Sequence, residues 1–256
     1  MKLEVNHTNL YYEVYGESLN ILEPTIIFLH DSLGCTELWR DFPQKISDQT
    51  GISCLSYDRQ GYGKSNPFST NKRTKKYLEN EAVVLKNFID TLNLRKVYLF
   101  GHSDGGSIAI IAASLYPQTI RGIITEGAHI FVEEITLNGI REAIHRYQTT
   151  NLKQRLEKYH GEKTEMVFKL WTETWLSPEF KDWNIESYLN HITCPSLIIQ
   201  GEDDEYGSLD QVESIITKTC GTSKKLVIKD VGHSPHKENQ VLVLKKTVEF
   251  LSSSNL

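Results

Sequence analysis

The sequence predicts an α/β fold with three layers, in which a mostly parallel sheet of eight strands carries helices on both faces. Two observations predict it. Short apolar runs alternate with helical patterns along the 256 residues, as parallel sheets require. The length also suits one domain large enough to bury such a sheet.

The expected strands are short apolar segments bounded by polar or glycine-containing turns, at 2–6, 9–15, 25–30, 52–57, 96–101, 120–126, 195–200 and 224–229. The first two read as a hairpin, and the other six as the parallel part of the sheet. Amphipathic patterns predict helices at 37–48, 75–93, 105–116, 209–219 and 238–252.

A long insertion separates the strands at 120–126 and 195–200. Residues from about 132 to 190 have a helical pattern rich in aromatic residues, and no Gly/Pro-rich linker sets them apart. We expect a single domain of residues 1–256, with a core of 1–131 and 191–256 and a helical cap over 132–190. Trp171 and Trp175 are one helical turn apart and share a face. They either anchor the cap to the core or roof a substrate pocket.

A sharp turn that presents a serine is predicted between the strand ending near residue 100 and the helix that follows. The turn reads Gly101-His102-Ser103-Asp104-Gly105. A Gly-x-Ser-x-Gly turn between a strand and a helix is a nucleophile elbow, which lifts the serine hydroxyl above the sheet. Five such letters also occur by chance, so the flanking strand and helix carry the argument.

The chain resembles the α/β-hydrolase fold family over nearly its whole length. Five segments with the family's pattern occur in the expected order: His30–Gly34, Asp58–Ser65, Gly101–Gly105, Gly201–Asp204 and Gly232–His236. The elbow is similar to that of the biphenyl-hydrolase-like and valacyclovir-hydrolase-like branch, which favours aminoacyl esters. The resemblance implies a Ser-Asp-His triad and an oxyanion hole of two main-chain N–H groups.

Carried over residue by residue, the resemblance makes Ser103 the nucleophile, His233 its base and Asp204 the acid that orients the histidine. The family's spacing puts that carboxylate three residues after the glycine of 201–204, while Glu126 at a strand end is the alternative. The oxyanion donors would be the N–H groups of Ser32 and Asp104.

Three other histidines lie near the predicted site. His102 adjoins the nucleophile but should point away from it, and His30 should shape the oxyanion loop. His236 lies one turn beyond the base, where it could line the substrate pocket. His233 is therefore a better candidate for the base than any of these three histidines.

Two residues depart from the family's pattern. Asp31 stands where the oxyanion loop usually has glycine, and aspartate tolerates unusual backbone angles better than most residues. We expect it to affect efficiency, with a weakened or non-catalytic site as the alternative. Asp104 either complements the dipole of its helix or selects a cationic substrate group, such as the α-amino group of an aminoacyl ester.

These residues predict hydrolysis of small carboxylic esters through an acyl-enzyme. Carbon–carbon bond hydrolysis, amide hydrolysis and acyl transfer to an alcohol use the same triad and stay open. Haloalkane dehalogenation needs a carboxylate at the nucleophile position, which is Ser103 here. A ligand sensor with little turnover is the non-enzymatic alternative.

Composition favours a cytoplasmic enzyme. The net charge is −5 and no basic stripe suggests nucleic-acid binding. No apolar run approaches the roughly 20 residues of a membrane span, and the first residues lack the apolar core of a signal peptide. The four cysteines form no CxxC pair. We expect no metal or cofactor, and a monomer or homodimer.

Overall fold

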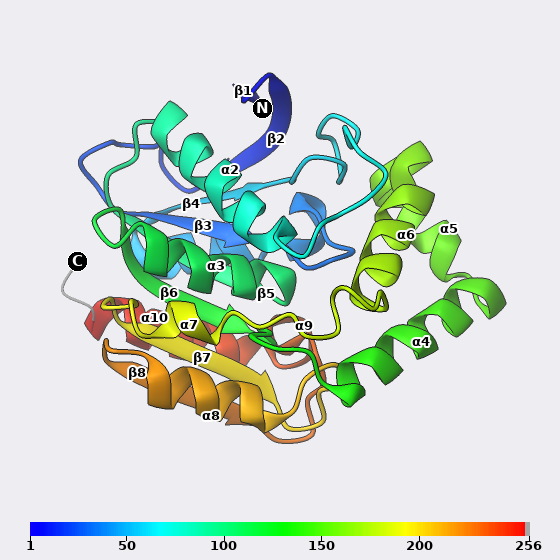
Figure 1. Ribbon diagram of the computed structural model, residues 1–256. Helices are drawn as coiled ribbons and strands as arrows, with labels where there is room; N and C mark the ends of the chain where they lie inside the picture. Colours follow the sequence, from blue (N-terminus) through cyan, green and yellow to red (C-terminus); the bar gives the residue numbers. More distant parts are fainter. Residues whose placement is uncertain (254–256) are drawn as a thin grey trace.

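A computed structural model describes residues 1–253 and contains the predicted eight-stranded sheet (Figure 1). Its order is β1-β2-β4-β3-β5-β6-β7-β8. The strands are β1 (Lys2–Val5), β2 (Thr8–Tyr15), β3 (Thr25–Leu29), β4 (Ser53–Tyr57), β5 (Val97–His102), β6 (Ile120–Glu126), β7 (Ser196–Gly201) and β8 (Ser223–Ile228).

The sheet is antiparallel at one edge and parallel elsewhere. β1 pairs with β2, and β2 with β4, in antiparallel register, whereas every later pairing is parallel. All residues of β3, β5 and β7 are buried. Continuous burial is expected where helices cover both faces of a parallel sheet, so the predicted fold class is confirmed.

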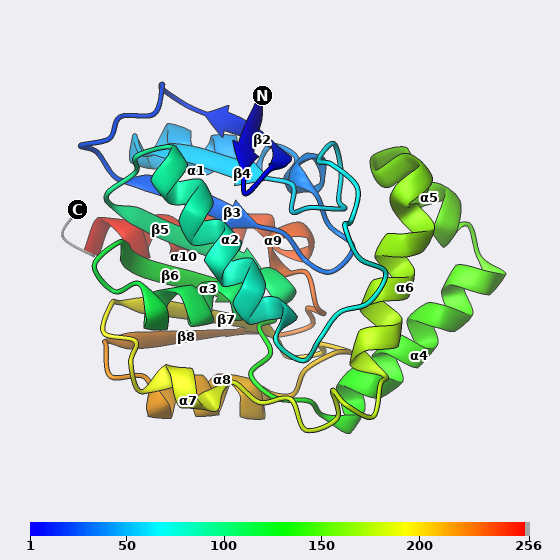
Figure 2. The same cartoon turned by 45° about the horizontal axis from the view of Figure 1, so that its top comes forward.

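Helices form a layer on each face of the sheet (Figures 1 and 2). One layer holds α2 (Tyr77–Thr91), α3 (Asp104–Leu115) and α8 (Leu209–Lys218), and the other holds α1 (Phe42–Thr50) and α10 (Gln240–Ser253). Each helix layer packs against its face of the sheet, and a separate hydrophobic cluster lies between them. Phe88, Ile110 and Val212 belong to one cluster, and Phe42 and Val243 to the other.

Two predicted helices begin differently in the structure. The helix expected at 37–48 is a 3₁₀ turn, η1 (Thr36–Trp39), followed by α1. Arg40 has φ of 53°, which an α-helix cannot accommodate. Pro43 lies in the first turn of α1, where no main-chain N–H is needed for a hydrogen bond within the helix. The helix expected at 238–252 is likewise α9 (Pro235–Glu238) and then α10.

The insertion between β6 and β7 consists mainly of helices. It contains α4 (Glu134–Thr149), α5 (Leu152–His160), η2 (Gly161–Lys163), α6 (Thr164–Trp175) and α7 (Glu186–Leu189). α4, α5 and α6 lie beyond the carboxyl ends of the strands (Figure 2), while α7 contacts α3 and α8. Within residues 1–253, no helix has the length and apolar character needed to cross a membrane.

The junction of α5 and α6 is anchored on loops of the core. The Nε2–H of His160 donates to the carbonyl oxygen of Leu33 at 2.9 Å, and its Nδ1 accepts the N–H of Gly63 at 3.0 Å. Lys163 donates to the carbonyl oxygens of Gly63 and Ser65 at 2.6 and 2.7 Å. The insertion is therefore tied to the loop that follows β3 and to the loop that follows β4.

Candidate active site

Ser103 occupies a sharp turn between β5 and α3. Its φ of 55° and ψ of −120° lie outside the ordinary regions for a residue with a side chain. A Cβ at Gly101 would lie 2.2 Å from the carbonyl oxygen of Gly105, and one at Gly105 would lie 2.0 Å from that of Leu29. Only glycine fits at both positions, which explains the spacing of the motif.

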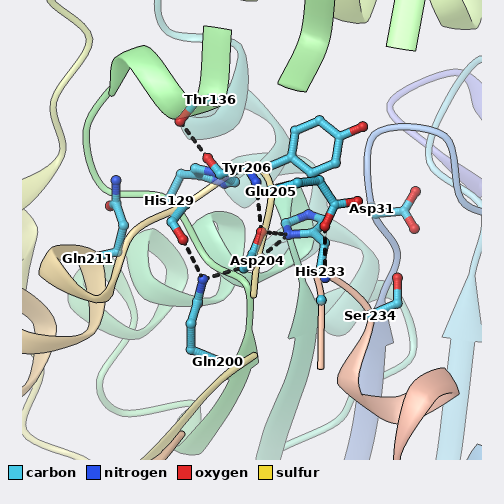
Figure 3. A network of polar contacts seen from close by, with 12 residues as sticks. Asp31, His129, Thr136, Gln200, Asp204, Glu205, Tyr206, Gln211, His233 and Ser234 are labelled. Carbon is cyan, nitrogen blue, oxygen red and sulfur yellow. Dashed lines mark hydrogen bonds and ion pairs between the residues drawn. The ribbon is translucent and has the colours of Figure 1, made fainter. Parts of the chain in front are cut away.

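The side chains of His233 and Asp204 meet at the ends of the two last strands (Figure 3). Nδ1 of His233 lies 2.8 and 2.9 Å from the two carboxylate oxygens of Asp204. The carboxylate also accepts the N–H of Tyr206 at 2.8 Å and the amide of Gln200 at 2.6 Å. Burial raises the pKa of Asp204, but His233 and the N–H of Tyr206 outweigh it and lower the pKa. An ionised Asp204 therefore fixes the orientation of the imidazole.

Two glutamates hold the main chain around His233. Glu205 accepts the N–H of His233 at 3.2 Å (Figure 3). Glu238 accepts the N–H groups of Gly232 and Ser234 at 2.7 and 2.9 Å. The loop after β8 is thus fixed by charged groups on both sides, which limits movement of the histidine.

Ser103 and His233 line one cavity of about 140 Å³. Its lining is mostly apolar or neutral: Asp31, Ser32, Leu33, His102, Ser103, Asp104, His129, Thr136, Ile140, Trp171, Trp175, Tyr206, His233 and Ser234. Among the described residues, no hydrogen bond yet joins the hydroxyl of Ser103 to His233. Such bonds often tighten only when substrate is bound.

Two main-chain N–H groups beside the cavity are unused. Neither the N–H of Ser32 nor that of Asp104 donates to another residue in the described part of the chain. Asp104 begins α3, so its amide also lies at the positive end of the helix dipole. These are the two predicted oxyanion donors.

The carboxylate of Asp104 is buried and engaged. It accepts the hydroxyl of Tyr77 at 3.0 Å and lies 3.6 Å from Nη1 of Arg59, with 1% of each charged side chain exposed. The indole N–H of Trp175 donates in turn to Tyr77 at 2.8 Å. A chain of polar contacts thus connects α6 to the elbow, and the negative charge of Asp104 is balanced by Arg59.

His236 lies elsewhere than expected. Its Nδ1 is 2.6 Å from Glu126, its ring packs on Trp39 at 4.6 Å between centroids, and it is not among the residues lining the cavity of Ser103. Burial raises the pKa of Glu126 to about 7. Since Glu126 pairs with His236 instead of His233, the alternative acid is not placed to orient the base.

Three other histidines near the site have structural contacts. His30 accepts the main-chain N–H of Arg59 at 3.1 Å and lies in the oxyanion loop, as expected. His102 donates through Nε2 to the carbonyl oxygen of His233 at 2.7 Å, since a carbonyl can only accept. His129, which the sequence did not single out, donates through Nε2 to the carbonyl oxygen of Tyr206 at 3.0 Å.

Sequence reasoning also missed Gln200 and Arg59. Gln200 is a buried amide at the end of an otherwise apolar strand, and that contrast is a signal that it orients a neighbour. Arg59 lies in the family segment Asp58–Ser65, but that segment does not reveal its contacts with His30, Asp31 and Asp104, which are far away in sequence. In residues 1–253, no group of three or more His, Cys, Asp or Glu side chains is arranged to hold a metal ion.

The sequence profile of the alpha/beta hydrolase fold matches residues 24–188. The chain is 31% identical to human serine hydrolase BPHL over 214 residues, which cover 79% of this chain and 69% of that protein. It is 26% identical to the 2-hydroxy-6-oxononadienedioate/2-hydroxy-6-oxononatrienedioate hydrolase of Klebsiella pneumoniae, covering 82% and 80% of the two chains.

Among solved structures, the meta-cleavage product hydrolase of Pseudomonas fluorescens superposes with a TM-score of 0.81 at 18% identity. The match covers 100% of this chain and 98% of that one. At this identity the likeness concerns the fold alone. Family profile, sequence relatives and fold agree, so this chain is a hydrolase of the alpha/beta hydrolase superfamily and belongs to its biphenyl-hydrolase-like and valacyclovir-hydrolase-like branch.

Proposed function

We propose that this protein hydrolyses small, neutral carboxylic esters through an acyl-enzyme on Ser103. The observation that carries the proposal is the convergence on one cavity of Ser103, His233 and the unused N–H groups of Ser32 and Asp104. A nucleophile, a base held by a carboxylate, and two oxyanion donors are what acyl transfer requires.

In the first half-reaction, the hydroxyl oxygen of Ser103 bonds to the ester carbonyl carbon while its proton passes to Nε2 of His233. The carbonyl oxygen becomes an oxyanion that accepts the N–H groups of Ser32 and Asp104. The carbon–oxygen ester bond then breaks, and His233 gives the proton to the departing alcohol. Water, activated by His233, attacks the acyl-enzyme and releases the acid and Ser103.

The lining of the cavity disfavours an anionic substrate, and its two carboxylates already have partners, Asp31 with His102 and Asp104 with Arg59. It includes Ile140, Trp171 and Trp175, and none of the described lining residues is lysine or arginine. A dianion, such as the substrates in the name of the Klebsiella relative, would find no cationic side chain there. Carbon–carbon bond hydrolysis on the same triad is the second candidate, since that relative supports it. We place the enzyme in the cytoplasm because its cysteines are unpaired.

Steady-state hydrolysis of p-nitrophenyl butyrate tests the proposal. We expect sustained turnover with a burst of p-nitrophenol equal to the concentration of enzyme when deacylation is slow. Turnover of a neutral vinylogous 1,5-diketone without ester turnover would favour carbon–carbon hydrolysis. Labelling of Ser103 by a fluorophosphonate without turnover of either substrate would favour a ligand sensor.

The pH dependence should report His233, which must be neutral to accept the proton of Ser103. Burial lowers the pKa of His233, but the charge and hydrogen bond of Asp204 outweigh it, so the pKa lies above the ordinary histidine value. We expect kcat/KM for p-nitrophenyl butyrate to fall as the pH drops below that pKa, with the slope of one ionisation. Initial rates between about pH 5 and pH 9 measure this.

Glu126 is the control for this profile, because its pKa of about 7 falls in the same range. The fall of kcat/KM at low pH should remain in the variant Glu126→Gln. If this fall disappears in the variant, or if its midpoint lies below the ordinary pKa of histidine, the assignment to His233 is contradicted.

Selection of cationic esters by Asp104 can be measured with two substrates of nearly equal shape. The p-nitrophenyl esters of L-valine and of 3-methylbutanoic acid differ by an ammonium group. Because Arg59 and Tyr77 already engage Asp104, we expect kcat/KM for the two esters to agree within about threefold, since balanced charges add little net attraction. A preference above about tenfold for the valine ester that Asp104→Asn abolishes would instead assign selection to Asp104.

A further inference from the structure

Asp31, the residue that replaces the family's glycine, contacts two segments of the site. Its Oδ1 accepts the N–H of Leu33 at 2.7 Å, and its Oδ2 lies 3.2 Å from Nδ1 of His102. Its main-chain oxygen accepts Nη2 of Arg59 at 2.7 Å. The carboxylate therefore fixes the turn that contains Ser32 and reaches the residue before Ser103.

His102 continues the chain of contacts to the base. Only 2% of its side chain is exposed, and its Nε2–H donates to the carbonyl oxygen of His233 at 2.7 Å. Both ring nitrogens of His102 thus face acceptors, Oδ2 of Asp31 and the carbonyl oxygen of His233, so the two hydrogen bonds form together only when each nitrogen carries a proton. The rings of His102 and His233 also pack at 5.1 Å between centroids.

Other titratable groups lie around Asp31 and His102. His102 faces Asp31, the rings of His233 and His236, and the buried Glu126, and Lys237 lies close enough to act on Asp31 and Glu126. Burial raises the pKa of Asp31, but the hydrogen bond and charge of His102 outweigh it and lower the pKa well below its usual range. Asp31 is therefore an ionised acceptor. Burial lowers the pKa of His102, and the hydrogen bond and charge of Asp31 oppose that shift, so an imidazolium that donates to both partners depends on Asp31.

We propose that Asp31 and His102 are a positioning pair for the reaction on Ser103. Asp31 orients the imidazole of His102, and His102 holds the carbonyl oxygen of His233. The carboxylate of Asp31 thereby holds both the main-chain N–H of Ser32 and the imidazole of His233 in fixed positions relative to the hydroxyl of Ser103. The inference rests on the proposed function, because it assumes that Ser103 and His233 react. Both residues act through others and are not catalytic residues.

Three substitutions separate the links of this chain. Asp31→Asn keeps volume and the acceptor for Leu33 but loses the charge that faces His102. His102→Gln keeps a donor at the place of Nε2 and loses the contact with Asp31. His102→Asn keeps a group at the place of Nδ1 and loses the contact with His233. Asp90→Asn, on the exposed side of α2, is the matched control.

The readouts are the second-order rate of labelling of Ser103 by a fluorophosphonate, and kcat and KM for p-nitrophenyl butyrate. Each rate is divided by the concentration of Ser103 that is labelled when the reaction is complete, so that unfolded protein does not contribute. We expect each variant at 31 or 102 to lose about tenfold in labelling rate and in kcat, because small misplacements of reacting groups are costly. KM should stay within about threefold, and Asp90→Asn should match the wild type.

The double variant Asp31→Asn/His102→Gln gives the sharpest result. Since both substitutions break the same contact, the double variant should lose no more than the worse single variant. Losses that multiply would overturn the proposal, as would a wild-type labelling rate in Asp31→Asn or an effect confined to KM.

Failure of the proposed function gives a different result, in which the wild type itself is not labelled at Ser103. The positioning pair is then still tested by proton NMR. The ring N–H signal of His102 should lie far downfield in the wild type and shift in Asp31→Asn but not in Asp90→Asn. An unchanged signal would overturn the inference.

Discussion

An alanine at position 103 is expected to lower kcat for p-nitrophenyl butyrate by about 10⁶-fold, the loss seen when a serine nucleophile is removed from a triad. Without its hydroxyl, no acyl-enzyme forms, and His233 has no proton to accept. The oxyanion donors and the cavity remain, so a small rate above that in water should persist. Initial rates and fluorophosphonate labelling measure both losses in the same samples.

Ser214→Ala is the matched control for this substitution. Ser214 lies on α8, and its hydroxyl donates to Glu186 on α7. It does not line the cavity of Ser103. It should retain wild-type kcat and labelling, while Ser103→Ala should show neither the burst nor the label. Activity above about one per cent in Ser103→Ala would show that another group is the nucleophile.

Replacement of Arg59 by methionine should cause the largest loss of stability, about 3 to 5 kcal/mol in the free energy of unfolding. Arg59 is buried, and it donates to the carbonyl oxygens of His30 and Asp31 at 3.2 and 2.7 Å while balancing Asp104. Methionine fills a similar volume but removes the cation nearest to the carboxylate, so that only the more distant Arg73 still acts on its charge. Urea unfolding followed by circular dichroism measures the effect.

The comparison needs two further variants. Arg141→Met removes an exposed arginine paired with Glu134 and should change stability by less than about 1 kcal/mol. Arg59→Met/Asp104→Asn should be more stable than Arg59→Met alone, because the uncompensated charge is gone. A loss below about 1 kcal/mol in Arg59→Met would mean that Asp104 does not depend on this arginine.

Local signals predicted the strands and the elbow well. The glycines at 101 and 105 are required by contacts within the turn and with one neighbouring strand, so the motif reveals them. Apolar runs predicted the central strands β3, β5 and β7 because both of their faces are buried, whereas β1, β2 and β8 are only partly buried. The break before α1 was missed because a single residue, Arg40, adopts an unusual φ that its sequence neighbours do not require.

The contacts of the site's charged groups could not be predicted from the sequence. Asp104 meets Arg59 and Tyr77, and His236 meets Glu126, across many residues and several elements. Spacing along the chain carries no information about such pairs. The sequence therefore indicated which residue types converge at the carboxyl ends of the strands, whereas charge balance and the role of Asp31 depended on packing.

The order of the strands bears on how the protein is made. Ser103 follows β5, whereas Asp204 and His233 follow β7 and β8, the last two strands in the chain. During synthesis the amino-terminal part emerges first, and the pairing of β6 with β7 must wait until the whole insertion has left the ribosome. If Ser103 is the nucleophile, as proposed, the nascent chain holds it without its acid and base until residues up to 233 have emerged and folded.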